Sequence, residues 1–321
     1  MSTKAKPSGA MLLGAAGTAL SISCGVSEFF MAIAMNREPP KAFSTLFGLI
    51  SGGEKAVGEQ PFFEKRDALR YAPHEQVVIL AKDGTRLCGH WFPHEEPKRI
   101  ILAVHGWRSP WYLDYCAVVD FWRANNCSFL IIDQRGQGES EGDYIGLGLQ
   151  ESEDIPSWID WINARCGMEL PVYIGGISMG ATTVLLASDY LYTPNVKGIL
   201  ADCGFLSPDA IIAHIANDNL HIPYAFLKFF TRAIYRRKTG RLTTQKSTVT
   251  ALQHTRLPVQ FFHGEEDRFV PLEMTYENYY ACASPKRILT VPGAGHGLSY
   301  IVQQKAYEEA YLSFWETYDK A

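Results

Sequence analysis

The sequence predicts an α/β fold in which helices cover both faces of an eight-stranded, mostly parallel sheet. From residue 75 onward, short apolar segments alternate with longer segments of helical periodicity, which is typical of successive strand–helix–strand units. Several of the short segments are apolar at every position, as expected for strands covered on both faces. Over fifty residues separate two of these strands, far more than an ordinary connection needs. We therefore expect a helical insertion there that forms a cap.

The eight predicted strands fall into two groups. The first two flank the turn Asp83-Gly84 and are predicted to form an antiparallel hairpin. The other six complete the mostly parallel part of the sheet. In chain order, the predicted strands are 77–80, 86–92, 100–104, 128–132, 172–175, 198–201, 259–262 and 287–291.

Helices are predicted where apolar residues recur at three- and four-residue spacing. Those expected to cover the sheet are 111–125, 151–165, 178–190 and 301–318. The cap, about 203–257, contains helical patterns over 207–216 and 223–237. It follows the carboxyl end of a strand, where open α/β sheets bind ligands. We expect one main domain over 70–321, preceded by an N-terminal apolar helix and linker over 1–69.

The N-terminal segment allows two interpretations. Lys4 and Lys6 precede an uncharged stretch that Gly and Ser dilute, so the segment is less apolar than an ordinary membrane span. One interpretation is a signal anchor that associates with a membrane through residues 8–35. The other is a helix that packs on the main domain of a cytoplasmic protein. Both stay open at this point.

Composition excludes several classes of partner. The chain has 321 residues with a net charge of −4 and scattered basic residues, so no nucleic-acid partner is expected. Its seven cysteines are odd in number and contain no C-x-x-C pair. This pattern favours free thiols over a disulfide framework or a zinc site. We expect neither a metal nor an organic cofactor.

One pentapeptide identifies a candidate nucleophile. Gly176-Ile-Ser178-Met-Gly180 follows a predicted strand and opens a predicted helix. A strained turn of this kind exposes the serine hydroxyl at the edge of the sheet, and its glycines allow close backbone approach. The helix N-terminus also favours developing negative charge.

A nucleophilic serine needs a base, and the base needs a group that orients it. Asp267 follows the strand 259–262, and His296 follows the last predicted strand. Both lie at strand carboxyl ends, on the same edge of the sheet as Ser178, and their order is that of hydrolases with such a serine turn. The two amide donors expected to bind the oxyanion are the N–H groups of Met179 and Trp107.

These motifs together resemble the α/β-hydrolase superfamily over roughly residues 70–321. Asp133-Gln-Arg-Gly-Gln-Gly-Glu-Ser140 is similar to the family's D-x-R-G-x-G-x-S loop. Gly264 to Pro271 resembles its acid loop, and Gly295-His296-Gly297 its histidine loop. Within the superfamily, the chain looks like the bacterial esterase and prolyl-oligopeptidase-like branch, particularly a group with an N-terminal apolar helix.

Departures from other branches narrow the resemblance. Trp107 follows Gly106 where the hormone-sensitive-lipase subfamily has further glycines, so that subfamily is disfavoured. Ser178 argues against epoxide hydrolases and haloalkane dehalogenases, which use Asp at this position.

The sequence therefore predicts a serine esterase that acts on small or medium carboxylic esters. Ser178 would attack the carbonyl, His296 would shuttle the proton, and Asp267 would orient the imidazole. Two alternatives stay open, namely a peptidase or amidase with the same triad and a non-catalytic binding protein. The residues expected to line a substrate pocket in the cap are Tyr224, Phe226, Phe229 and Phe230.

Overall fold

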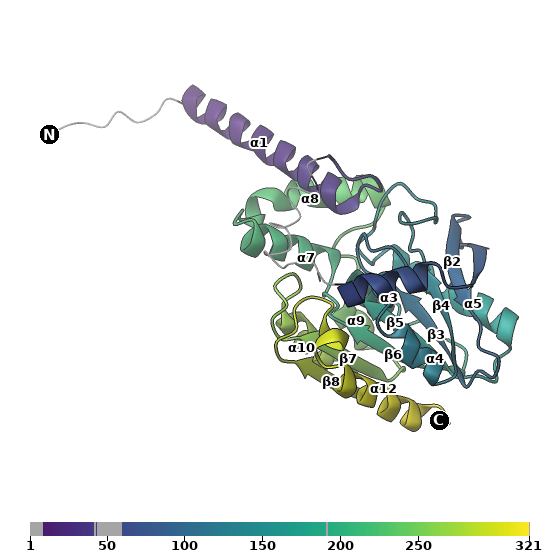
Figure 1. The fold of residues 1–321 in the computed structure, drawn as a ribbon. Helices are drawn as coiled ribbons and strands as arrows, with labels where there is room; N and C mark the ends of the chain where they lie inside the picture. Colours follow the sequence, from purple (N-terminus) through teal and green to yellow (C-terminus); the bar gives the residue numbers. More distant parts are fainter. Residues whose placement is uncertain (1–8, 42, 44–59, 191, 321) are drawn as a thin grey trace.

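The computed structural model describes residues 9–41, 43, 60–190 and 192–320. Its centre is an eight-stranded sheet in the order β1-β2-β4-β3-β5-β6-β7-β8 (Figure 1). The strands are β1 (Glu75–Leu80), β2 (Arg86–Phe92), β3 (Arg99–Val104), β4 (Cys127–Ile132), β5 (Val172–Ile177), β6 (Val196–Asp202), β7 (Val259–Gly264) and β8 (Lys286–Val291). Strand β2 pairs antiparallel with β1 and β4, and the remaining pairs are parallel. The predicted fold class is confirmed.

Helices cover both faces of the sheet because both faces of the central strands are apolar. Every residue of β3 and β4 is buried. On one face, α5 (Ile155–Cys166) and α6 (Met179–Leu186) pack against the sheet through residues such as Trp158 and Val184. On the other face lie α4 (Val119–Ala124) and α12 (Gln304–Tyr318), with Trp122 and Phe314 buried. The short α11 (Ser299–Val302) precedes α12.

The helix predicted over 111–125 is shorter than expected. Only α4 is regular helix, and the residues before it form turns. The Tyr115 hydroxyl donates to the Val104 carbonyl oxygen at 2.8 Å and accepts from the Val104 amide at 3.1 Å. This pair of hydrogen bonds ties the turn to the end of β3, a long-range contact that residue periodicity does not report.

A helical insertion lies between β6 and β7, in the segment predicted to form a cap, and we refer to it as the cap. It consists of α7 (Pro208–His214), the π-helical turn η2 (Ile215–Asn219), α8 (Tyr224–Thr239) and α9 (Thr248–Leu252). Gly240 ends α8 in the left-handed conformation, with φ 70°, which glycine adopts without steric cost. In Figure 1, α7 and α8 stand beyond one end of the sheet. Helix α10 (Leu272–Ala281) follows β7 and packs near α9.

The N-terminal helix α1 (Gly9–Met35) lies alongside α8. Its last turns are buried, with Phe30, Met31 and Ile33 in the same apolar cluster as the cap residues Leu227 and Ile234. This arrangement corresponds to a helix packed on the main domain. Among the described residues, no helix has the length and apolar character needed to cross a membrane.

The described part of the predicted linker includes helix α3 (Gln60–Arg70). It packs on the face of the sheet that carries α4, where Leu69 is buried. The Lys65 ammonium lies 3.5 Å from the Asp120 carboxylate in α4.

Candidate active site

Ser178 occupies a strained turn between β5 and α6. Its backbone has φ 56° and ψ −119°, a conformation that costs a non-glycine residue about 1–3 kcal/mol. The Ser178 amide donates to the Asp202 carbonyl oxygen at 2.8 Å, which fixes the turn to the end of β6. Contacts with the neighbouring strands keep Ser178 in this strained conformation.

The two glycines of the pentapeptide are required by close backbone contacts. A Cβ atom at position 180 would lie 1.9 Å from the Val104 carbonyl oxygen, so only Gly180 fits against β3. A Cβ atom at position 176 would lie 2.3 Å from the Gly180 carbonyl oxygen, so Gly176 is required as well. The close backbone packing of the turn therefore explains why the pentapeptide has glycine at both ends.

The structure brings Ser178, His296 and Asp267 together from the ends of β5, β8 and β7. His296 Nε2 lies 2.8 Å from Ser178 Oγ, and His296 Nδ1 lies 2.7 Å from Asp267 Oδ2. Ser178 and Asp267 are buried, whereas His296 is half-buried. In this geometry the imidazole can accept the serine proton while the carboxylate fixes its tautomer.

Asp267 is held as a carboxylate by four donors. Its Oδ1 accepts the Phe269 and Val270 amides at 2.9 and 2.8 Å. Its Oδ2 lies near His296 Nδ1 and, at 3.1 Å, His263 Nε2. Burial alone would raise the pKa of this carboxyl group, but the charge of His296 and the hydrogen bonds from both histidines hold it well below the ordinary value.

The pKa of His296 shifts in the opposite direction. Burial would lower it, but the Asp267 carboxylate raises it well above the ordinary histidine value. The buried thiol of Cys203 also lies against His296, and burial raises the pKa of that thiol to about 12. Side-chain ligand atoms of Cys203, Asp267 and His296 all lie within 4.8 Å of one another. Asp267 and His296 are hydrogen-bonded to each other, so each of them already has a partner within this cluster.

His263 is a residue of this site that sequence analysis did not assign. Its ring is fully buried at the end of β7. Besides approaching Asp267, its Nε2 lies 2.9 Å from the Val270 carbonyl oxygen, and its Nδ1 lies 2.7 Å from Thr275 Oγ1. The available signal is a histidine four residues before the acid. It precedes Asp267, whereas the base of the predicted triad follows the acid.

The loop after β3 lies beside the nucleophile. A Cβ atom at Gly106 would be 3.3 Å from Ser178 Cβ. The amides on either side of Trp107 are held, because Gly106 N donates to Asp114 Oδ2 at 2.6 Å and Arg108 N to Gln137 Oε1 at 2.6 Å. In the described part of the chain, the backbone N–H of Trp107 donates no hydrogen bond.

Met179, the other residue predicted to supply an oxyanion donor, begins α6. The first amides of an α-helix have no acceptor within the helix, so the Met179 N–H is available at the helix N-terminus. Its side chain is fully buried among the cap residues. The structure thus brings both predicted donor residues next to Ser178.

A narrow apolar cleft opens at Ser178. Its volume is about 30 Å³. Apart from Ser178, the lining side chains are all apolar and come from α1, the cap and three loops: Phe30, Ile33, Ala34, Trp107, Leu147, Phe205, Ile211, Ile212, Ile215 and Phe269.

The four aromatic residues predicted to line a pocket in the cap do not line this cleft. Tyr224 is buried, and its hydroxyl donates to Asp209 Oδ1 at 2.8 Å. Phe230 is half-buried, while Phe226 and Phe229 are 70% and 74% exposed. Helix α8 buries its other face, and α1 helps to cover that face. The contribution of α1 to the cleft was not predicted.

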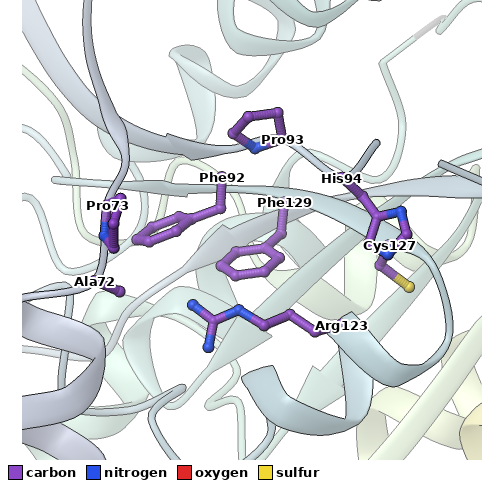
Figure 2. Close-up of a pocket in the computed structure, with 8 residues that line it drawn as sticks. All are labelled: Ala72, Pro73, Phe92, Pro93, His94, Arg123, Cys127 and Phe129. Atoms are coloured by element: carbon purple, nitrogen blue, oxygen red, sulfur yellow. The ribbon is translucent and has the colours of Figure 1, made fainter. Parts of the chain in front are cut away.

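A larger hollow lies at the opposite edge of the sheet. It has a volume of about 340 Å³, and Phe92, Phe129 and Arg123 form much of its lining (Figure 2). The Arg123 guanidinium lies over the Phe129 ring, 5.6 Å from its centre. Because β4 begins at Cys127, this hollow lies at strand amino ends, whereas Ser178 lies at a strand carboxyl end.

Comparison with known proteins agrees with this architecture. Residues 100–310 match the sequence profile described as "Alpha/beta hydrolase family". YqkD of Bacillus subtilis (strain 168) is 24% identical over 238 residues, which cover 74% of this chain and 77% of YqkD. YfhR of Escherichia coli (strain K12) is 25% identical over 284 residues, which cover 83% of this chain and 90% of YfhR.

Solved structures with the same fold include an esterase. The Pyrococcus furiosus esterase PF2001 superposes with a TM-score of 0.64 at 19% sequence identity, covering 83% of this chain and 97% of the esterase. At this identity the likeness establishes the shared fold.

Proposed function

Because the chain belongs to the alpha/beta hydrolase family, we propose that it is a serine hydrolase that cleaves carboxylic esters. The observation that carries this proposal is the hydrogen-bonded chain from Ser178 Oγ through His296 to Asp267, at 2.8 and 2.7 Å. Hydrogen bonds of this length allow direct proton transfer between nucleophile and base. An esterase with the same fold is consistent with this reaction class.

The proposed reaction has two halves. In the first, a bond forms between Ser178 Oγ and the carbonyl carbon while the serine proton passes to His296 Nε2. The carbon–oxygen bond to the alcohol then breaks, and His296 returns the proton to the departing oxygen. In the second half, His296 deprotonates a water that attacks the acyl-enzyme, releasing the acid and restoring the serine hydroxyl.

The other groups of the site act on charge and orientation. Asp267 holds the imidazole in the tautomer that presents Nε2 to the serine and stabilises the imidazolium as it forms. The Trp107 and Met179 amides stabilise the negative oxygen of the tetrahedral intermediates, each contributing a few kcal/mol.

The lining of the cleft supports uncharged, apolar substituents on the substrate. Its side chains include Ile33, Ile212 and Phe269 and offer no partner for a charge, and burying an unpaired charge is costly. We therefore expect esters whose acyl or alcohol part is apolar. A peptide bond needs polar partners for its amide groups, which these walls do not supply.

A covalent probe tests the nucleophile directly. We expect a fluorophosphonate to add one phosphonyl group to the wild-type protein, measured by intact mass, and to leave the Ser178→Ala variant unmodified. A Ser157→Ala variant, altered in α5, is the matched control and should react as the wild type does. Absence of the adduct from the wild type, or equal reaction of Ser178→Ala, would overturn the assignment.

Substrate class is tested on the same proteins. Matched p-nitrophenyl esters and p-nitroanilides of one acyl group distinguish ester from amide chemistry. We expect turnover of the esters and far slower turnover of the anilides. A protein that hydrolyses neither would be a binding protein with this fold.

A further inference from the structure

Helices α1 and α8 expose large apolar side chains to solvent. Besides the exposed rings of Phe226 and Phe229 on α8, Ile22 is 62% exposed and Phe29 is 44% exposed on α1. Residues three or seven positions apart lie on the same face of a helix. Each helix therefore has its own exposed apolar face, in addition to the face that it buries.

The two helices that carry these faces, α1 and α8, run side by side in the same direction. The Ser23 hydroxyl donates to the Phe226 carbonyl oxygen near the start of α8. Near its end, Lys238 Nζ donates to Asn36 Oδ1 at 2.7 Å. Figure 1 shows α1 reaching across this end of the molecule, with its first turns extending beyond the cap.

We call this the α1–α8 surface, defined by the following exposed side chains: Ile22, Phe29, Phe226 and Phe229. Soluble monomers rarely expose large contiguous apolar patches unless the patch binds something.

The surface carries positive charge in a protein that is acidic overall. Helix α8 contains five basic residues and no acidic one, whereas the whole chain has a net charge of −4. Two of the five are paired, Arg232 with Asp209 and Arg237 with Glu28. Arg236 is exposed and, seven positions after Phe229, lies on the same face as that ring. Lys228 is exposed as well, but it lines a separate hollow with Asp209. Positive charge beside exposed aromatic residues is the pattern of helices that lie on anionic lipid.

We propose that the α1–α8 surface docks on the face of a bilayer that contains anionic lipids. The aromatic and aliphatic side chains would enter the boundary between head groups and acyl chains, while the cations of α8 would contact lipid phosphates. A second copy of this chain fits the surface less well. A two-fold interface would bring the same cations of both copies together, with mutual repulsion.

The buried face of α1 connects this surface to the cleft. Phe30, Ile33 and Ala34 line the cleft at Ser178, and they lie on the same helix as the exposed Ile22 and Phe29. The distance between docked surface and cleft is thus about the width of one helix, roughly 10 Å. Docking in itself does not require catalysis, so the proposal stands independently of the proposed hydrolase activity.

Vesicle flotation tests the proposal with the full-length chain. We expect the protein to float with vesicles of phosphatidylcholine and phosphatidylglycerol, and to do so less with phosphatidylcholine alone or in high salt. The double variant Phe226→Ser/Phe229→Ser should partition roughly tenfold more weakly, or worse, because it removes the inserted rings. Arg236→Glu should weaken binding severalfold, on the anionic vesicles alone.

Matched controls alter equally exposed residues elsewhere. Leu80→Ser/Tyr280→Ser removes two side chains that are 68% and 76% exposed, and Lys82→Glu/Lys305→Glu reverses two exposed charges. Both controls should bind as the wild type does. Far-UV circular dichroism and thermal unfolding monitor folding, and each single α8 variant is measured as well.

Three outcomes would overturn the proposal. The first is a wild-type protein that does not float. The second is flotation that the α8 variants and salt leave unchanged, which would indicate insertion of α1 alone. The third is an effect of the α8 variants on self-association in solution without an effect on vesicle binding.

Discussion

At the scale of single residues, the site depends on how Asp267 is shared between two histidines. His296 Nδ1 and His263 Nε2 both approach the same carboxylate oxygen, at 2.7 and 3.1 Å. One histidine faces the nucleophile and the other faces the protein interior. The contacts of His263 with the interior therefore help to fix the position of Asp267, and Asp267 in turn orients His296 beside the nucleophile.

The raised pKa of His296 predicts how activity depends on pH. Only the neutral imidazole accepts the serine proton, so activity is lost as pH falls through the pKa of His296. Since Asp267 raises that pKa, we expect kcat/KM for p-nitrophenyl butyrate to increase with pH through a midpoint above about 6.5. The measurement is a profile of kcat/KM from about pH 5 to pH 9.

Asp267→Asn provides the matched comparison. Loss of the carboxylate charge should move the midpoint to lower pH and reduce kcat roughly 10³–10⁴-fold, a size known for the corresponding change in serine proteases. A wild-type midpoint at or below the ordinary histidine value would contradict the expectation, as would a variant with the same midpoint as the wild type.

His263 is predicted to be a positioning residue for Asp267. His263→Leu removes the donor to the carboxylate, and hydrogen bonds to charged groups are worth about 1.5–3 kcal/mol. We expect kcat to fall roughly tenfold or more with little change in KM. His263→Gln, which retains a donor near the position of Nε2, should recover much of the loss.

Thermal unfolding of the same variants distinguishes this role from a purely structural one. Thr275→Val removes the partner on the other side of the ring and serves as the control. His263→Leu and His263→Gln could instead lose activity equally and in proportion to their loss of stability. That result would mean that His263 has a packing role alone.

At the scale of elements, α1 is part of the cleft and should therefore influence substrate size. Ala34 lines the cleft, and its carbonyl oxygen accepts the indole N–H of Trp107 at 2.8 Å. Ala34→Phe would fill the remaining space. We expect the ratio of kcat/KM for octanoate over acetate p-nitrophenyl esters to fall on the order of tenfold, a size typical of methylene discrimination in apolar pockets.

Ala32→Phe is the comparison variant, because Ala32 is half-buried on the same helix and does not line the cleft. It should keep the wild-type ratio. Equal effects of the two substitutions would mean that α1 acts through its general packing and not as a wall of the cleft.

At the scale of the whole molecule, the fold was predictable because its signals are local. The strands β3 and β4 are apolar at most positions, and the turn Asp83-Gly84 marks the hairpin that begins the sheet. The residues Ser178, Asp267 and His296 could be grouped for a related reason. Each follows a strand of a largely parallel sheet, so topology alone brings them to one edge.

The cleft could not be predicted because its walls depend on how separate helices face one another. On α8, Leu227 and Ile234 form an apolar face that points inward, while Phe226 and Phe229 form a second one that points outward. The sequence of the helix does not distinguish two apolar faces. The contact of α1 with α8 joins segments about 200 positions apart, which no local pattern reports.

That separation along the chain also has a consequence for the order of synthesis. Ser23 and Phe226, which are hydrogen-bonded in the folded protein, are 203 positions apart. A ribosome adds about 5–20 residues each second, so roughly 10–40 s pass between the synthesis of α1 and that of its partner helix. During this interval the face of the nascent α1 that packs on the cap stays uncovered. The part of the cleft wall that α1 supplies is therefore made well before the cap helix against which it packs.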